Sequence, residues 1–141
     1  MKKIIYLTSL LLLAACNEAP PIIITKPCAL DQPIANSIRP AAEIMSVDGW
    51  VFDNQTVVQP ERIRIQFTST NLKFSKTFEA KQGIKRTDLV TAYSAPNAEL
   101  SGFHLEVPGN SLAPGQYEIV ILRDLANATL ACSNSHIVQM K

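Results

Sequence analysis

Side chains suited to acid–base, nucleophilic or metal chemistry are few in this sequence, and their spacing does not bring them together. The two histidines, His104 and His136, form neither the His-x-His nor the His-x-x-x-His pair that usually begins a zinc site. There is no Gly-x-Ser-x-Gly nucleophile motif and no glycine-rich phosphate loop. Glycoside hydrolysis would need two acids that meet only on folding. The acids available for that are Asp48, Asp53, Glu79, Asp88, Glu99, Glu106, Glu118 and Asp124.

We therefore expect no enzyme activity, no metal and no cofactor. The alternatives that stay open are a two-histidine site or a pair of carboxylates that the fold assembles, since neither would leave a mark in the spacing.

The first residues have the pattern of an export signal. Lys2 and Lys3 precede an apolar run over residues 4–15, which is too short to span a bilayer and has the length of a signal-peptide core. The run ends in Leu13-Ala14-Ala15-Cys16, which resembles the lipobox of bacterial lipoproteins. The resemblance implies cleavage before Cys16, a diacylglycerol on its thiol and an acyl group on the new amino terminus. The alternative is an ordinary signal peptide that happens to precede a cysteine.

The lipobox resemblance also predicts where the protein resides. Several acyl chains make a stable membrane anchor, whereas a single chain would be marginal. In the lipoprotein family an aspartate after the lipidated cysteine often retains the protein at the inner membrane, and this chain has Asn17 there. We expect a lipid-anchored outer-membrane protein, on the periplasmic face or the cell surface. Residues 1–15 would be the signal, 16–27 a lipidated tether and 28–141 the folded domain.

Two cysteines remain if the thiol of Cys16 carries the lipid. Cys28 and Cys132 lie near the two ends of the expected domain, and an exported chain folds in an oxidising compartment, so they most simply pair. The bridge would close a loop of about a hundred residues, worth roughly 4–5 kcal/mol in the chain-entropy model. No Cys-x-x-Cys redox motif is present. A reactive thiol or a metal ligand is the alternative.

The charge balance argues against nucleic acid as a partner. Lys2 and Lys3 leave with the signal, so eleven of the thirteen basic residues remain beside twelve acidic ones, and no clustered positive field of the kind that nucleic acid requires is expected.

Five basic residues lie close together in the sequence, with Glu79 as the only acidic residue between them. One interpretation is a solvated strand face that discourages edge aggregation. The other is a docking patch for an anionic partner such as lipopolysaccharide, a glycan or an acidic protein face. The five residues are Lys73, Lys76, Lys81, Lys85 and Arg86.

The elements that would position these residues read as short strands separated by turns. Residues 62–67 alternate strictly, with Ile63, Ile65 and Phe67 on one face, which is the period of a half-buried strand. Residues 29–42 read as a loop with at most a short strand, and residues 84–94 as a helical turn across the end of a sheet. Further strands are expected within 17–27 at an edge, and at 44–52, 73–78, 103–107, 117–122 and about 132–138. About seven strands of this kind predict an all-β antiparallel sandwich of immunoglobulin type.

Four short motifs agree with that fold. In order, they resemble bacterial immunoglobulin-like modules that have a Gly-Trp-x-x-Asp strand, an Arg-x-Asp-Val turn, a Gly-Phe strand and a Pro-Gly-x-Tyr strand. The resemblance covers about residues 44–124, departs from the pattern with Leu89 in place of valine, and implies a fold without catalytic residues. The motifs are residues 49–53, 86–93, 101–103 and 112–117.

Two functions follow from the anchor and the fold. The first is a non-enzymatic binding or assembly accessory that presents loops or an edge strand to a protein complex of the cell envelope. The alternative is a cell-surface or periplasmic glycan-binding module. The resemblance implies this function because such modules are often appended to sugar-handling or cell-surface proteins. The module would bind the sugar on the rings of Trp50, Tyr93 and Tyr117.

Overall fold

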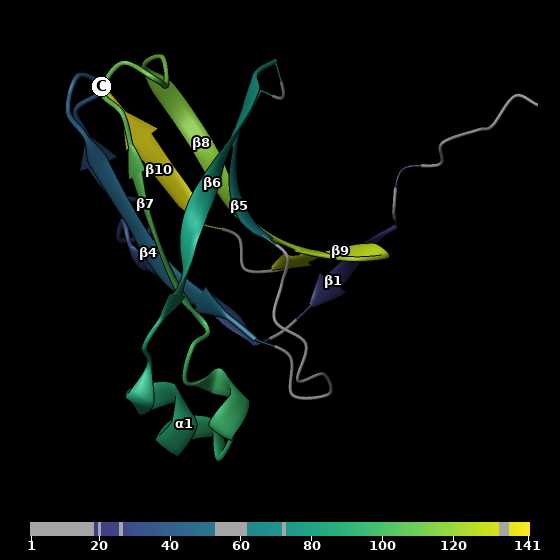
Figure 1. Ribbon diagram of the computed structural model, residues 1–141. Coiled ribbons are helices and arrows are strands. Elements are labelled where there is room, and N and C mark those ends of the chain that lie inside the picture. The colour runs from purple at the N-terminus through teal and green to yellow at the C-terminus, as the bar shows by residue number, and fades with distance from the viewer. Residues whose placement is uncertain (1–18, 20, 26, 53–61, 72, 133–135) are drawn as a thin grey trace, which may run out of the picture.

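A computed structural model describes residues 19, 21–25, 27–52, 62–71, 73–132 and 136–141. The predicted signal 1–15, the predicted lipid-bearing Cys16 and Asp53, the last residue of the first motif, lie outside the described residues. The described chain is an all-β sandwich with one short α-helix (Figure 1).

The sandwich has two layers. The first layer has, in spatial order, β1 (Ile22–Thr25), β9 (Ala128–Cys132), β8 (Gly115–Leu125), β5 (Arg62–Ser69) and the beginning of β6 (Ser75–Ile84). Its remaining strands are β10 (Ile137–Met140), which pairs with β8, and β3 (Ile38–Arg39), which pairs with β10. The second layer has the end of β6, then β7 (Gly102–Val107), β4 (Met45–Val51) and β2 (Cys28–Gln32).

Strand β6 belongs to both layers. Its residues 75–80 pair with β5, and Lys81 to Ile84 pair with β7 (Figure 1). The register shifts at Gly83, whose φ of 79° is a conformation that glycine adopts readily and other residues rarely do. The strand therefore carries the sheet from one layer into the other, and the ten described strands form one curled sheet.

The core lies between the facing sides of the two layers. The predicted alternation of β5 is confirmed, because Ile63, Ile65 and Phe67 are no more than 2% exposed. The strand predicted at 117–122 is also confirmed as part of β8, which is a central strand with β5 on one side and β9 and β10 on the other. From the second layer the core receives Val47, Phe103, Leu105 and Val107.

A second apolar cluster lies on the outer side of the second layer. Trp50 is 7% exposed and packs with Phe52 and Leu89 beneath α1 (Thr87–Tyr93) and the 3₁₀ helix η1 (Pro96–Ala98). The predicted helical turn is thus confirmed. Trp50 is buried on this outer side and not between the sheets, because it alternates along β4 with Val51, which faces the core, and so points to the opposite side. Within the described ranges, neither helix is long and apolar enough to cross a membrane.

Three strand predictions need correction. The described chain has ten strands where about seven were expected. Residues 29–42, expected to be a loop with at most a short strand, contain most of β2, which pairs with β4, and all of β3, which pairs with β10. The single strand expected at about 132–138 is two strands, β9 ending at Cys132 and β10 beginning at Ile137, which pair with opposite halves of β8.

A charged network links three strands of the first layer. Asp124 on β8 accepts hydrogen bonds from Arg64 at 2.7 Å, from Arg62 at 2.9 Å and from Thr129 at 2.9 Å. The side chain of Asp124 is only 10% exposed. The hydrogen bonds from Arg64 in particular lower the pKa of Asp124 from 3.8 to about 2.

We expect Asp124→Asn to lower the free energy of unfolding at pH 7 by about 2 kcal/mol, the equivalent of that pKa shift. The folded carboxyl binds its proton less readily than the unfolded one, so the network stabilises the fold above about pH 4 and loses this effect as the pH falls toward 2. Urea unfolding at pH 7, 4 and 2.5 would measure both changes, with Glu106→Gln on the exposed side of β7 as a control. An equal loss of stability with acid in wild type and Asp124→Asn would contradict the prediction.

Candidate functional site

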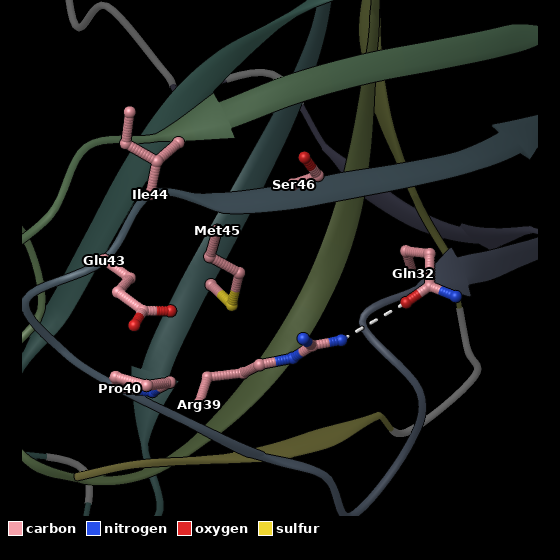
Figure 2. A pocket seen from close by; sticks show the side chains of 7 residues that line it. All are labelled: Gln32, Arg39, Pro40, Glu43, Ile44, Met45 and Ser46. Carbon is pink, nitrogen blue, oxygen red and sulfur yellow. Dashed lines mark hydrogen bonds between the residues drawn. The ribbon is translucent and has the colours of Figure 1, made fainter.

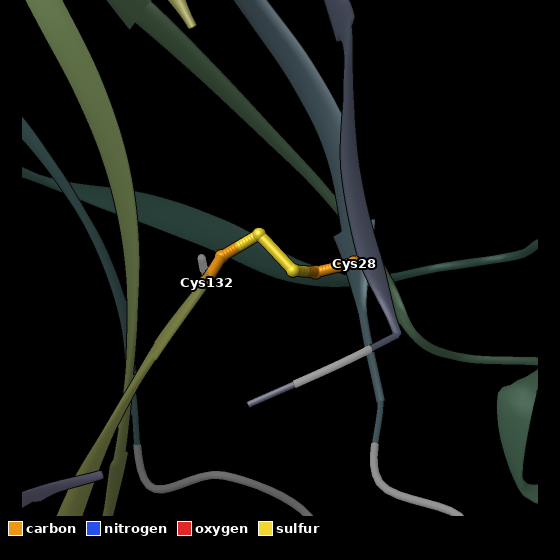
Figure 3. The surroundings of a disulfide bond; sticks show 2 residues. All are labelled: Cys28 and Cys132. Atoms are coloured by element: carbon orange, nitrogen blue, oxygen red, sulfur yellow. A yellow bond between two sulfur atoms is a disulfide. The ribbon is translucent and has the colours of Figure 1, made fainter. Parts of the chain in front are cut away.

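The two layers are joined covalently by the predicted disulfide. Cys28 at the start of β2 bonds to Cys132 at the end of β9, with 6.0 Å between their Cα atoms (Figure 3). The sulfurs are buried within the main core. The bridge therefore fixes β2, at the edge of the second layer, to β9 in the first layer.

The predicted basic docking patch is spread along β6 instead of being gathered into one surface. Lys76 points toward the core, where its ammonium donates to the carbonyl of Ser111 at 3.0 Å and lies 5.3 Å from the Phe78 ring. Lys85 forms an ion pair with Glu99 at 2.9 Å. Lys73 and Lys81 have exposed side chains.

Arg86, the fifth member of that group, is held by two acids. It pairs with Asp88 at 2.8 Å and with Asp31 at 2.7 Å, and its side chain is 19% exposed. The hydrogen bonds between Arg86 and Asp88 raise the pKa of the arginine and lower that of the aspartate. Arg86, Lys76 and Lys85 all have local partners, so three of the five basic residues are engaged locally. The docking function of the group stays a prediction.

The three rings considered for glycan binding do not share a surface. Trp50 and Tyr117 are 7% and 3% exposed, and Tyr117 packs in the main core. Tyr93 is 42% exposed but lies against Trp50, with 5.5 Å between ring centroids. Because stacking on a sugar needs an exposed ring face, the aromatic argument for a glycan site loses its support.

The two histidines are bound to different neighbours. On the outer side of the second layer, His104 Nδ1 lies 2.6 Å from Asp48 Oδ1, and both side chains are about 40% exposed. His136 Nε2 lies 2.5 Å from the carbonyl oxygen of Pro33. Among the residues that the structure describes, no group of three or more histidine, cysteine, aspartate or glutamate side chains is arranged to hold a metal ion.

A polar pocket that sequence reasoning did not find opens at one end of the sandwich, between β3 of the first layer and β4 of the second (Figure 2). Its volume is about 230 Å³. Figure 2 shows Arg39 extending below Met45 toward Gln32, while the carboxylate of Glu43 points into the same space. The lining residues are Gln32, Arg39, Pro40, Glu43, Ile44, Met45 and Ser46.

The wall of this pocket formed by β4 is an open strand edge. On one side β7 pairs with β4 along Met45 to Trp50, whereas on the other side β2 reaches only Asp48. In the described part of the chain, no strand pairs with that second edge beyond Asp48. Phe52 donates its backbone N–H to the carbonyl of Pro27, the residue just before β2, and therefore directs it to that second side. Because the hydrogen-bonding groups of a strand alternate between its edges, Ser46 presents its N–H and C=O to the open side.

Arg39 gives the pocket a positive charge with unused hydrogen-bonding capacity. Its Nη2 donates to Gln32 Oε1 at 3.3 Å, which is long for such a bond, and its buried Nε has no partner among the described residues. The described contacts include no ion pair between Arg39 and Glu43. A guanidinium in this state suits a planar carboxylate, with which it can form two parallel hydrogen bonds.

The sequence contained little sign of this pocket. Arg39 lies on a two-residue strand, β3, which exists only because it pairs with β10 near the other end of the chain. Its flanking residues, which include Pro33 and Pro40, have no hydrophobic period. The one usable signal was a lone arginine in an otherwise uncharged stretch between Asp31 and Glu43.

Three of the immunoglobulin-like motifs meet at the α1 end of the second layer. Trp50 pairs across the strands with Gly102, and a Cβ atom on Gly102 would lie 2.9 Å from Cγ of Arg86. The backbone at Gly102 is thus closely packed against Arg86. In comparisons with known proteins, no family model matches this chain and no curated protein matches it either. The membership suggested by these motifs and by the lipobox therefore stays an interpretation of the sequence.

Proposed function

We propose that this chain is a lipoprotein anchored in the outer membrane through Cys16, and that it acts as a non-enzymatic binding accessory for a protein complex of the cell envelope. The observation that carries the binding role is the pocket between β3 and β4, which is lined by an open strand edge and by an incompletely bonded arginine. Open edges of this kind are surfaces to which other chains add a strand.

The position of the pocket relative to the proposed anchor supports a partner away from the membrane. Only residues 17–21 separate Cys16 from β1, so β1 lies within roughly 22 Å of the lipid. The chain then enters β2 at Cys28, which is opposite Val51 at the far end of β4 from Ser46. A seven-residue strand is about 20 Å long. The pocket thus opens at the end of the second layer that is remote from the tether.

Crosslinking in living cells tests the binding role. We expect a photoreactive phenylalanine derivative in place of Ile44, which is 67% exposed beside the pocket, to give one dominant adduct with one envelope protein. The matched control is Leu100, which is 48% exposed near η1 at the opposite end of the second layer. Adducts from Ile44 with abundant porins alone, or the same adducts from both positions, would count against an accessory that uses this pocket.

A further inference from the structure

We infer that the pocket between β3 and β4 binds an extended peptide segment of a partner protein, which pairs with the backbone of Ser46 as an added strand and places a carboxylate beside Arg39. This inference rests on the proposed binding role and adds the chemistry of the partner. It does not depend on the lipid anchor.

The backbone of β4 provides the pairing site. Ser46 directs one donor and one acceptor to an edge that β2 leaves at Asp48. In an antiparallel ladder these two groups are satisfied together by one residue of a neighbouring strand. The existing pairing of β4 with β7 holds this edge in the extended form, so an incoming segment would lose little free energy in ordering the site.

The side chains specify the charge of the segment. Arg39 lies across the pocket with one long hydrogen bond and a buried Nε that has no partner among the described residues (Figure 2). A carboxylate in the pocket would form charge-assisted hydrogen bonds with this guanidinium. Glu43 points into the same pocket and would repel that carboxylate, so the two side chains have opposite effects on an acidic ligand.

The size of the pocket agrees with a chain segment. Pockets that enclose a drug-sized molecule have volumes of about 300–1,000 Å³, and this one has about 230 Å³. It is too small to enclose such a molecule and continues into an open strand edge, which suits a peptide that crosses the pocket with one or two residues inside it. The exposed Ile44 adds apolar contact next to the edge.

The test is a selection of peptides on the mature full chain, purified in detergent micelles. The probe is a phage-displayed library of random octapeptides, and the selected peptides are then measured by fluorescence anisotropy. We expect enrichment of Asp or Glu and depletion of Pro. Arg39→Gln should weaken binding by about tenfold or more, the loss typical of a charged hydrogen-bonded pair, whereas Glu43→Gln should strengthen it.

A pair of variants at one position tests the backbone contact separately. Ser46→Pro removes the N–H that faces the open edge and should abolish binding, whereas Ser46→Ala keeps that N–H and should bind as wild type does. Circular dichroism would check that each variant is folded, and Arg39→Gln serves as the decisive variant if Ser46→Pro does not fold. Methylation of the backbone nitrogens of a selected peptide should also remove binding.

Failure to enrich any peptide, or equal binding by Arg39→Gln and wild type, would overturn the inference. The proposed function fails in a different way, through the absence of a specific adduct from Ile44 in cells. A specific adduct without peptide binding would therefore leave the accessory role in place and remove only the acidic strand as its partner.

Discussion

Replacing Cys28 and Cys132 together by alanine is expected to lower the free energy of unfolding by about 4–5 kcal/mol. The disulfide closes a loop with a sequence separation of 104, and in the chain-entropy model a loop of about this length contributes about 4.7 kcal/mol by restricting the unfolded chain. Both residues are also buried in the main core, at 4% and 5% exposure. The loss is a large share of the 5–15 kcal/mol that holds a typical domain in its native state.

Denaturant unfolding of the purified protein at neutral pH measures this effect. The single variant Cys28→Ala should lose nearly as much stability as the double variant, and wild type treated with a reductant should unfold at about the same denaturant concentration as either. A titration of free thiols on the unreduced wild type is the control for oxidation. Equal unfolding midpoints in wild type and the double variant would show that the bridge does not stabilise the domain.

The second large effect is expected on cell fractionation. Cys16→Ala removes the thiol that the lipobox resemblance assigns to lipid, so the protein should move from the washed membranes to the soluble periplasmic fraction. With a stabilisation of about 0.8 kcal/mol for each buried CH₂ group, several acyl chains hold a protein on a membrane stably, and their loss leaves no comparable attachment.

A second chain separates the effect of the lipid from that of the signal. It has an ordinary cleavable secretory signal in place of residues 1–15, together with Cys16→Ala, and it should also be soluble after export. If this chain stays with membranes through a high-salt wash, its attachment does not depend on lipid at Cys16.

The sequence predicted those parts of the fold that local patterns control. The strict alternation of residues 62–67 corresponds to β5, and the apolar run from Tyr117 corresponds to central β8. The disulfide was predictable by elimination, because one of three cysteines was assigned to lipid and an oxidising compartment favours pairing of the other two. Each of these signals depends on residues close together in the chain, or on composition.

What the sequence did not predict depends on pairing between distant segments. Strand β3 has two residues and exists because Ile38 and Arg39 lie beside Gln139 and Met140. The face that buries Trp50 depends on α1, which follows β4 by more than thirty residues. The pocket depends on both effects, since Arg39 comes from β3 and its open wall arises where β2 separates from β4. The hydrophobic period of a single segment does not predict contacts between segments that are distant in the sequence.

For the basic group the error is the opposite one. The sequence suggested a single basic surface, and the fold does not bring these residues together into one. Five cations within fourteen residues read as a patch. In an extended strand that length covers tens of ångströms, and Lys76, Lys85 and Arg86 have partners of their own. Nearness in sequence is therefore a poor guide to a charged surface when the segment is a strand.

Mass spectrometry of the mature protein, isolated from washed bacterial membranes, tests the anchoring most directly. The expected result is a chain that begins at Cys16, with the mass of a diacylglycerol on its sulfur and of an acyl group on its amino terminus. An unmodified Cys16, or a chain that still carries residues 1–15, would contradict the proposed place of this protein on the membrane.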